Sequence, residues 1–174
     1  GAADDKSITL YAVFEINKYN VTLNPNGGSV DVTTIVVTYS STYGAAKNGE
    51  ADIAINSIIP TFKGHNFLGW YSAKEGGVKV TNATDVTDTP YTELFAHWEV
   101  KHYEVTVHLN GGNVNGDTND VVVNVTFGQA YSNFIAFTPA RNGYGFNGWF
   151  TLAEGGKQID LATIVDEDEN GKIQ

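Results

Sequence analysis

An acidic run near residue 170 has the residue types and the spacing of a calcium-binding loop. Residues 166–173 read D-E-D-E-N-G-K-I and fit the first half of the pattern D-x-D-x-N-G-x-I. In that pattern Asp166, Asp168 and Asn170 would supply the hard oxygen ligands that Ca²⁺ prefers. The twelfth position, which holds a bidentate Glu in such loops, falls beyond Gln174, and no flanking helices are expected. An acidic, solvated turn is therefore the interpretation that we favour, with calcium at these three residues as the alternative.

Few other residues could carry chemistry. The histidines are His65, His97, His102 and His108, and a metal site would need several of them to converge with carboxylate support. Cysteine is absent, so the sequence offers no thiolate nucleophile, disulfide or cysteine-based metal site. It also lacks a Ser-His-Asp spacing, a nucleophile elbow and a phosphate-binding glycine loop. We therefore expect no catalytic residue, no cofactor and no enzymatic activity in this chain.

The three tryptophans could act as a carbohydrate-binding surface. Trp70, Trp98 and Trp149 could stack on sugar rings if their side chains were exposed. However, they occupy landmarks of an internal repeat, and residues that define a repeat more often pack in its core. Core packing is therefore the interpretation that we favour, with a sugar-binding platform as the alternative.

Composition and charge exclude several classes of partner. The 174 residues include 10 Lys plus Arg against 20 Asp plus Glu, which gives a net charge of -10. Because no basic patch interrupts this acidity, we expect no binding to nucleic acid. No apolar run approaches the roughly 20 residues of a membrane-spanning helix, so we expect no membrane insertion by this fragment. Methionine is absent even at position 1, which suggests a processed or excised fragment with Gly1 as a cloning scar.

The most informative feature of the sequence is an internal repeat. Residues 18–28, K-Y-N-V-T-L-N-P-N-G-G, return as residues 102–112, H-Y-E-V-T-V-H-L-N-G-G. Later landmarks recur in the same order: V-T-Y at 37–39 and V-T-F at 125–127, G-W-Y at 69–71 and G-W-F at 148–150, and E-G-G at 75–77 and 154–156. Residues 94–100, L-F-A-H-W-E-V, also match residues 10–16, L-Y-A-V-F-E-I.

These matches predict three parts of the chain. Residues 1–17 would be the closing strand of a preceding repeat, residues 18–100 repeat one, and residues 101–174 repeat two without its own closing strand. Repeat one is longer than repeat two between Tyr43 and Pro60, whereas repeat two carries an insertion between Asn113 and Asp120.

The order of the landmarks resembles a known family. The pattern N-G-G, V-T-Y/F, P-x-x-x-G, F-x-G-W-Y/F, E-G-G and L-Y/F-A-x-W is similar to the Listeria-Bacteroides repeat, the family of internalin B-repeats. The match covers nearly the whole chain, and its landmarks occur twice in the same order. The resemblance implies a β-grasp-like unit, a small sheet curled over a short helix. It also implies tandem copies on surface proteins of Gram-positive or Bacteroides-type bacteria.

Hydrophobic periodicity supports a fold dominated by strands. Apolar residues alternate with polar ones over 19–23 and 103–109, the period of two that a half-buried strand requires, and every second residue over 35–39 and 121–127 is again apolar. Residues 67–71, 94–98 and 146–150 are predicted as further strands. Only 45–59 and 132–136 have helical prospects, and Pro60 and Pro139 would end them. The predicted fold is mainly β or α+β, with two tandem β-grasp-like repeats, each a small curled sheet with a short helix, plus an N-terminal orphan strand.

Three functions agree with these observations. The first is an extracellular or cell-surface spacer that also serves as an adhesion or interaction module, with a host protein or glycan as partner. The second is a carbohydrate-binding or adhesin module that uses exposed aromatic residues. The third is an accessory domain of a surface enzyme whose catalytic residues lie elsewhere in the parent protein.

The matching N-terminal strand suggests a further partner, a neighbouring repeat. An unpaired hydrophobic strand edge invites the addition of another strand. Residues 10–16 of one molecule could therefore complete repeat two of the next molecule. Alternatively, residues 10–16 run directly into repeat one and pair locally.

Overall fold

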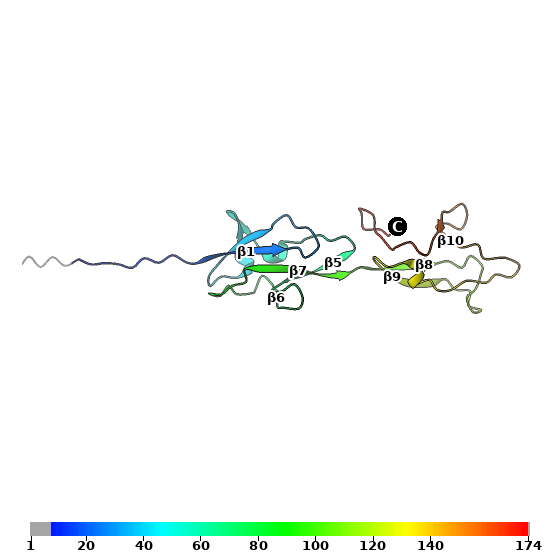
Figure 1. Cartoon of the computed structure of the whole chain (residues 1–174), viewed down its shortest axis with the longest axis horizontal. Coiled ribbons are helices and arrows are strands. Elements are labelled where there is room, and N and C mark those ends of the chain that lie inside the picture. The colour runs from blue at the N-terminus through cyan, green and yellow to red at the C-terminus, as the bar shows by residue number, and fades with distance from the viewer. Residues whose placement is uncertain (1–7, 174) are drawn as a thin grey trace, which may run out of the picture. The chain divides into compact units, whose positions relative to one another are not determined.

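The computed structural model describes residues 8–173, which are built mainly from β-strands (Figure 1). The prediction of a mainly-β fold is therefore confirmed. The described residues form two compact units. Unit 1 contains the described residues up to Asn26 together with 30–59 and 69–96, and unit 2 contains 27–29, 60–68 and the described residues from 97 onward. The predicted sequence boundaries after residues 17 and 100 stay a prediction.

The largest sheet has seven strands in the order β4-β3-β2-β1-β7-β5-β6. Strand β1 pairs antiparallel with β2 on one side and parallel with β7 on the other. In chain order the strands are β1 (Lys18–Asn24), β2 (Thr34–Thr38), β3 (Ala46–Asn48), β4 (Ala51–Ile53), β5 (His65–Tyr71), β6 (Lys79–Val80) and β7 (Glu93–Val100).

The core of unit 1 follows from the alternation of apolar residues along these strands. Val21 and Leu23 on β1 are buried with Ile35 and Val37 on β2, and Val21 lies opposite Ile35 in the antiparallel register. Leu94 on β7 is also fully buried and lies opposite Leu23. Burying each of these side chains contributes about 1.5–3 kcal/mol, so this face fixes the register of the sheet.

Unit 2 has two smaller sheets of two strands each. Strand β8 (His102–Val107) pairs antiparallel with β9 (Val121–Thr126), and β10 (Trp149–Phe150) pairs antiparallel with β11 (Gln158–Ile159). Their shared core is a cluster of five buried residues, Val107, Val125, Tyr131, Ile135 and Val165.

The two copies of the sequence repeat share two strand pairings. Trp70 lies opposite Val80 where β5 meets β6, and Trp149 lies opposite Ile159 where β10 meets β11. Likewise β8 and β9 repeat the antiparallel pairing of β1 with β2. The internal repeat of the sequence is therefore also a repeat of the fold.

An Asn-Gly pair turns the chain after the first strand of each copy. Asn26 and Gly27 have φ values of 47° and 100°, and Asn110 and Gly111 have φ values of 46° and 78°. Asn and Gly tolerate such left-handed backbone better than other residues. Asn26 also donates a hydrogen bond from its side-chain amide to the carbonyl of Ala96, over 3.0 Å. The turn is thus tied to β7.

The short helix of the predicted fold is not confirmed, and neither is the β-grasp detail. The helical elements in the described residues are three 3-10 turns, Tyr43–Ala45, Ile55–Ser57 and Tyr131–Asn133. Within the stretch 45–59, residues 46–53 fold instead into the hairpin of β3 and β4, because Gly49 takes a φ of 61° between them and closes a tight turn. No helix in the described part of the chain is long and apolar enough to cross a bilayer.

Residues 8–17 form no strand and precede β1 as an extended segment (Figure 1). The strand expected at 10–16 is therefore not formed within the chain, and its local pairing with repeat one is not observed. Strand β1, which follows this segment, already pairs with β2 and β7, so neither edge of β1 is open to residues 10–16. The apolar side chains of this segment are exposed, with Leu10 at 89% and Phe14 at 88%.

Candidate functional site

The acidic run predicted from the sequence forms a tight turn in unit 2. The Asp168 carboxylate accepts hydrogen bonds from the backbone N–H groups of Asn170 and Lys172, over 2.8 and 2.9 Å. The Asp168 N–H donates to the carbonyl of Lys172, and Gly171 takes a left-handed φ of 74°. An Asp that accepts from the amides two and four residues ahead stabilises the turn by itself. The Asp168 carboxylate therefore holds the backbone of this turn.

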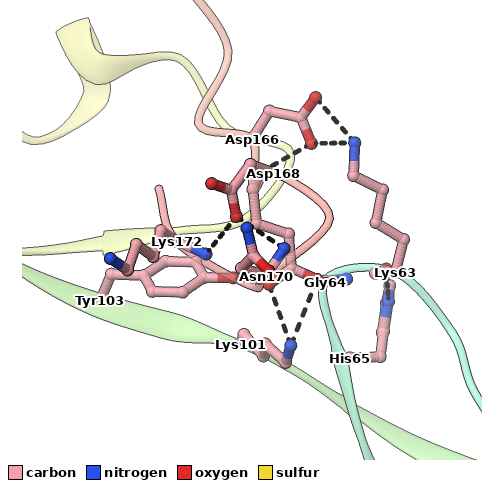
Figure 2. Close-up of polar contacts among 10 residues, drawn as sticks. Lys63, Gly64, His65, Lys101, Tyr103, Asp166, Asp168, Asn170 and Lys172 are labelled. Carbon is pink, nitrogen blue, oxygen red and sulfur yellow. Dashed lines mark hydrogen bonds and ion pairs between the residues drawn. The ribbon is translucent and has the colours of Figure 1, made fainter. Parts of the chain in front are cut away.

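Asp166 points away from this turn toward a lysine. Figure 2 shows Lys63 reaching the Asp166 carboxylate, with an Nζ to Oδ1 distance of 2.7 Å. Both side chains are about half exposed. The hydrogen bond from Lys63 lowers the pKa of Asp166 below its usual value. Because the pair is open to solvent, we expect it to contribute little to stability.

Glu167 lies between these two carboxylates in sequence and is the buried one, with an exposure of 6%. Its oxygens accept three kinds of hydrogen bond: from the Tyr103 hydroxyl over 2.6 Å, from the Gly64 backbone N–H over 2.7 Å, and from Lys101 Nζ over 2.9 Å. Lys101 also forms the ion pair that balances the charge (Figure 2). A buried carboxylate is stable only when it is paired and hydrogen-bonded in this way.

These contacts shift the pKa values of Glu167 and Tyr103 in opposite directions. The hydrogen bond from Tyr103, with those from Lys101 and Gly64, lowers the pKa of Glu167 to about 2, although burial acts against this shift. Burial and the neighbouring Glu167 charge raise the pKa of Tyr103 to about 12. Glu167 is therefore ionised and Tyr103 is protonated over the whole physiological pH range.

Backbone contacts position Glu167 and two of its partners. Two residues before Glu167, Val165 is fully buried, and its N–H donates to the carbonyl of Gln129. The Lys101 N–H, at the start of β8, donates to the carbonyl of Gly64 over 2.8 Å. Three segments that are distant in sequence, at 63–64, 101–103 and 166–167, thus meet inside unit 2. We call Gly64, Lys101, Tyr103 and Glu167 the Glu167 cluster.

Gly64 is required at its position for two reasons. Its φ is 71°, and a Cβ atom added to it would overlap the ring of Phe127. The close approach of the Gly64 backbone is what allows its N–H to reach Glu167. Next to it, His65 stacks on Phe62 with ring centroids 4.1 Å apart and contacts the edge of Phe127. The aromatic packing and the carboxylate therefore hold the same loop.

The proposed calcium ligands do not converge in the described residues. Asp166 is paired with Lys63, and Asp168 is bound to the amides of its own turn, next to Asn170. Within residues 8–173, no group of three His, Asp or Glu side chains lies close enough to hold a metal ion. Calcium binding here stays a prediction. The acidic pattern drew attention to this turn, but it gave no signal for the central role of Glu167.

The histidines lie in separate environments. His65 donates from Nδ1 to the carbonyl of Lys63, and His102 forms a hydrogen bond with the Thr126 hydroxyl. His108 contacts the exposed Asp120 carboxylate over 2.6 Å, and this hydrogen bond lowers the pKa of Asp120. The fourth histidine, His97, lies on β7.

The tryptophans pack within the fold. Trp70 is buried, with an exposure of 1%, and donates from Nε1 to the carbonyl of Ile58 over 2.8 Å, as core packing predicts. Trp98 packs against Phe62 and Phe67, each with a centroid distance of 5.5 Å. Trp149 is half-buried and packs against other aromatic rings, those of Phe137 and Phe146.

Two copies of one strand-rich unit, with the same landmarks and pairings, define a tandem-repeat protein. The chain belongs to the Listeria-Bacteroides repeat domain family, whose model matches residues 19–97 and again residues 103–170. The resemblance seen in the sequence is therefore confirmed.

Curated relatives share this region at moderate identity. A protein of Evansella cellulosilytica named "Putative membrane protein" is 31% identical over 148 residues, which are 83% of this chain and 19% of that protein. Internalin H of Listeria monocytogenes is 30% identical over 122 residues, which are 67% of this chain and 21% of that protein. The chain thus spans about a fifth of the length of these relatives. No solved structure matches it.

Proposed function

We propose that this chain is a non-catalytic repeat region of a bacterial cell-surface or secreted protein, in which it acts as a spacer and interaction module. The observation that carries the proposal is the repetition of one unit with the same strand register in both copies. Adding such units lengthens a protein without new chemistry, because each copy brings its own pairing pattern. Two further points support it: membership of the repeat family, and a relative named as an internalin.

The side chains that could do chemistry support a structural role. Glu167, the most buried carboxylate among the described residues, is held by Lys101, Tyr103 and Gly64. Asp168 closes a turn, and Trp70 fills the core. Each of these groups stabilises the fold through contacts that a substrate would have to displace.

A carbohydrate-binding or adhesin module is the second candidate, and one observation favours it. Unit 2 exposes Tyr144, Phe146 and Phe150, with Tyr144 67% accessible. The guanidinium of Arg141 lies over the Tyr144 ring, 4.2 Å from its centroid. Exposed aromatic rings with a nearby cation are able to stack on sugars or to bind a host protein.

Replacing this region in the parent protein distinguishes the spacer role from the adhesin role. In one strain the region is deleted, and in another it is exchanged for unrelated repeats of equal length. A spacer predicts that antibody access to the domain beyond the region falls on deletion and returns with the unrelated repeats. If the unrelated repeats restore access but not attachment to host cells or glycans, the region is an adhesin. If deletion changes neither readout, the proposal is wrong.

A further inference from the structure

The first and the last strand of repeat one are neighbours in its sheet. The family model matches residues 19–97, a range that begins on β1 and ends on β7. These two strands pair in parallel, with Leu23 opposite Leu94 (Figure 1). The chain therefore enters the repeat at the start of β1 and leaves it at the opposite end of the strand pair, along β7.

This arrangement determines how a pulling force acts on the repeat. A force that stretches the chain pulls the start of β1 in one direction and the end of β7 in the other. Because the two strands are parallel, the force slides them past each other along their length, and the hydrogen bonds between them must break together. In an antiparallel pair that is pulled apart from one end, the bonds break one after another. The parallel pair therefore resists extension more strongly.

Backbone and side-chain hydrogen bonds both connect β1 and the turn after it to the region of β7. The Thr22 N–H donates to the carbonyl of Thr92 over 2.9 Å, just before β7 begins. The side-chain amide of Asn24 donates to the Glu93 carboxylate over 2.9 Å. Past the end of β1, the side-chain amide of Asn26 is bound to a carbonyl of β7. These bonds are spread along the strand pair, so a sliding movement loads all of them.

The strand pair is also well protected from water. Leu23 on β1 and Leu94 and Ala96 on β7 are buried. Neither strand is at an edge of the sheet, because β2 lies on the other side of β1 and β5 on the other side of β7. Hydrogen bonds in such a shielded position are stronger than exposed ones and are not readily exchanged for bonds to water.

We propose that β1 and β7 form a mechanical clamp through which repeat one bears tension along the chain. The parallel pairing of the first and last strands gives the clamp its strength, and the bond from Asn24 to Glu93 adds a side-chain bridge. This inference deepens the proposed spacer role and takes its biological meaning from it. A spacer that projects a domain from a cell is stretched whenever that domain holds on to another surface.

Single-molecule pulling of the full chain in two directions tests the clamp. The chain has no cysteine, so Lys18→Cys/Glu99→Cys provides attachment points at the start of β1 and near the end of β7. Lys18→Cys/Thr38→Cys provides them on residues that lie opposite each other in the antiparallel pair of β1 and β2, which is then peeled from its end. At equal load, the folded repeat should survive at least about tenfold longer in the first variant, because several hydrogen bonds break together. Equal lifetimes in the two directions would overturn the proposal.

A substitution at the side-chain bridge tests the clamp in a second way. Added to Lys18→Cys/Glu99→Cys, Glu93→Ala removes the acceptor of the Asn24 amide and should shorten the lifetime under load about tenfold. Glu50→Ala removes the same charge at the exposed turn between β3 and β4, so it should leave the lifetime unchanged. Equal lifetimes of these two variants would show that the bridge carries no load and would overturn its place in the clamp. The comparison of pulling directions needs neither variant, so it decides the main claim even if Glu93→Ala does not fold.

The clamp and the spacer role fail in different experiments. Equal lifetimes in both pulling directions would overturn the clamp and leave the location of the parent protein unaffected. An antibody against the chain that fails to reach intact cells would overturn the surface role and leave the mechanical result unaffected.

Discussion

The hydroxyl of Tyr103 donates a 2.6 Å hydrogen bond to the buried carboxylate of Glu167, although 64 residues separate the two. The same carboxylate accepts from the backbone of Gly64, which is 103 residues away. Tyr103 belongs to the second sequence repeat and Gly64 to the first. The two hydrogen bonds to Glu167 therefore connect residues of both sequence repeats within unit 2. Unit 2 is therefore held together by the polar Glu167 cluster as well as by the apolar core that contains Val107, Val125 and Val165.

Tyr103→Phe should destabilise the chain by about 1–2 kcal/mol, because the buried Glu167 carboxylate loses its shortest hydrogen bond while its ion pair with Lys101 remains. Denaturant unfolding at neutral pH measures the difference. Tyr144→Phe, at an exposed tyrosine, is the control and should change stability by less than about 0.5 kcal/mol. Equal effects of the two changes would show that the hydroxyl of Tyr103 has no special role.

Acid should unfold the chain partly through Glu167. Its folded pKa of about 2 lies below the ordinary value of 4.5, so its contribution is fully present above pH 4.5 and is lost as pH falls toward 2. This contribution is about 2–3 kcal/mol. In Glu167→Gln the free energy of unfolding should therefore decrease less between pH 4.5 and pH 2 than in the wild type. Glu104→Gln, at an exposed position of β8, should leave this pH dependence unchanged. An unchanged acid slope in Glu167→Gln would contradict this account.

High pH should lower the stability of the chain through Tyr103, the hydrogen-bond partner of Glu167. The pKa of Tyr103 is raised from 10.0 to about 12, so its contribution is present below pH 10 and is lost as pH rises toward 12. Burial also raises the pKa of Tyr43 and of Tyr131, so the ultraviolet absorbance of tyrosinate should show more than one late-titrating group. Tyr103→Phe should reduce the late-titrating absorbance by one tyrosine, and an unchanged late absorbance in this variant would contradict the assignment to Tyr103.

Gly64→Ala should be more harmful than an alanine at a glycine with similar backbone geometry. Gly64 and Gly49 have φ values of 71° and 61°, but an added Cβ would meet Phe127 at Gly64 and nothing within 4 Å at Gly49. Gly49→Ala should therefore cost only the conformational strain of about 1–2 kcal/mol. Gly64→Ala should cost about 2–4 kcal/mol, because overpacking adds to that strain. Thermal unfolding of both variants checks the difference, and equal losses would contradict the steric explanation.

Calcium should have little effect on the folded chain. Lys63 pairs with Asp166, and the turn amides bind Asp168, so a cation would have to displace both sets of contacts. We expect the melting temperature to be the same in chelator and in about 1 mM Ca²⁺, a concentration at which extracellular calcium modules are filled. A rise in melting temperature that Asp168→Ala removes would instead establish the calcium loop.

Local patterns in the sequence predicted much of the fold. The alternation at 19–23 and 103–109 identified β1 and β8, and the Asn-Gly pairs identified the left-handed turns after them. The helix expected within 45–59 was not formed, because the Asn48-Gly49 pair closes a hairpin there and its strands extend the sheet beside β2. Local propensity could not show that this edge was available, since the edge exists only after β1 and β2 have paired.

The candidate site was harder to predict because its partners are distant in sequence. The acidic run pointed to 166–171, but nothing nearby distinguishes the buried Glu167 from the exposed Glu169. That difference comes from Lys101, Tyr103 and Gly64, which reach Glu167 only through tertiary folding. A single sequence carries no signal for contacts of this kind.

The proposed location at the cell surface is tested most directly by labelling intact bacteria with an antibody raised against this chain. The account predicts that the antibody labels cells that have not been permeabilised, and that brief protease treatment of intact cells removes the label. Labelling that appears only after permeabilisation would contradict the proposal that this repeat region belongs to a surface protein.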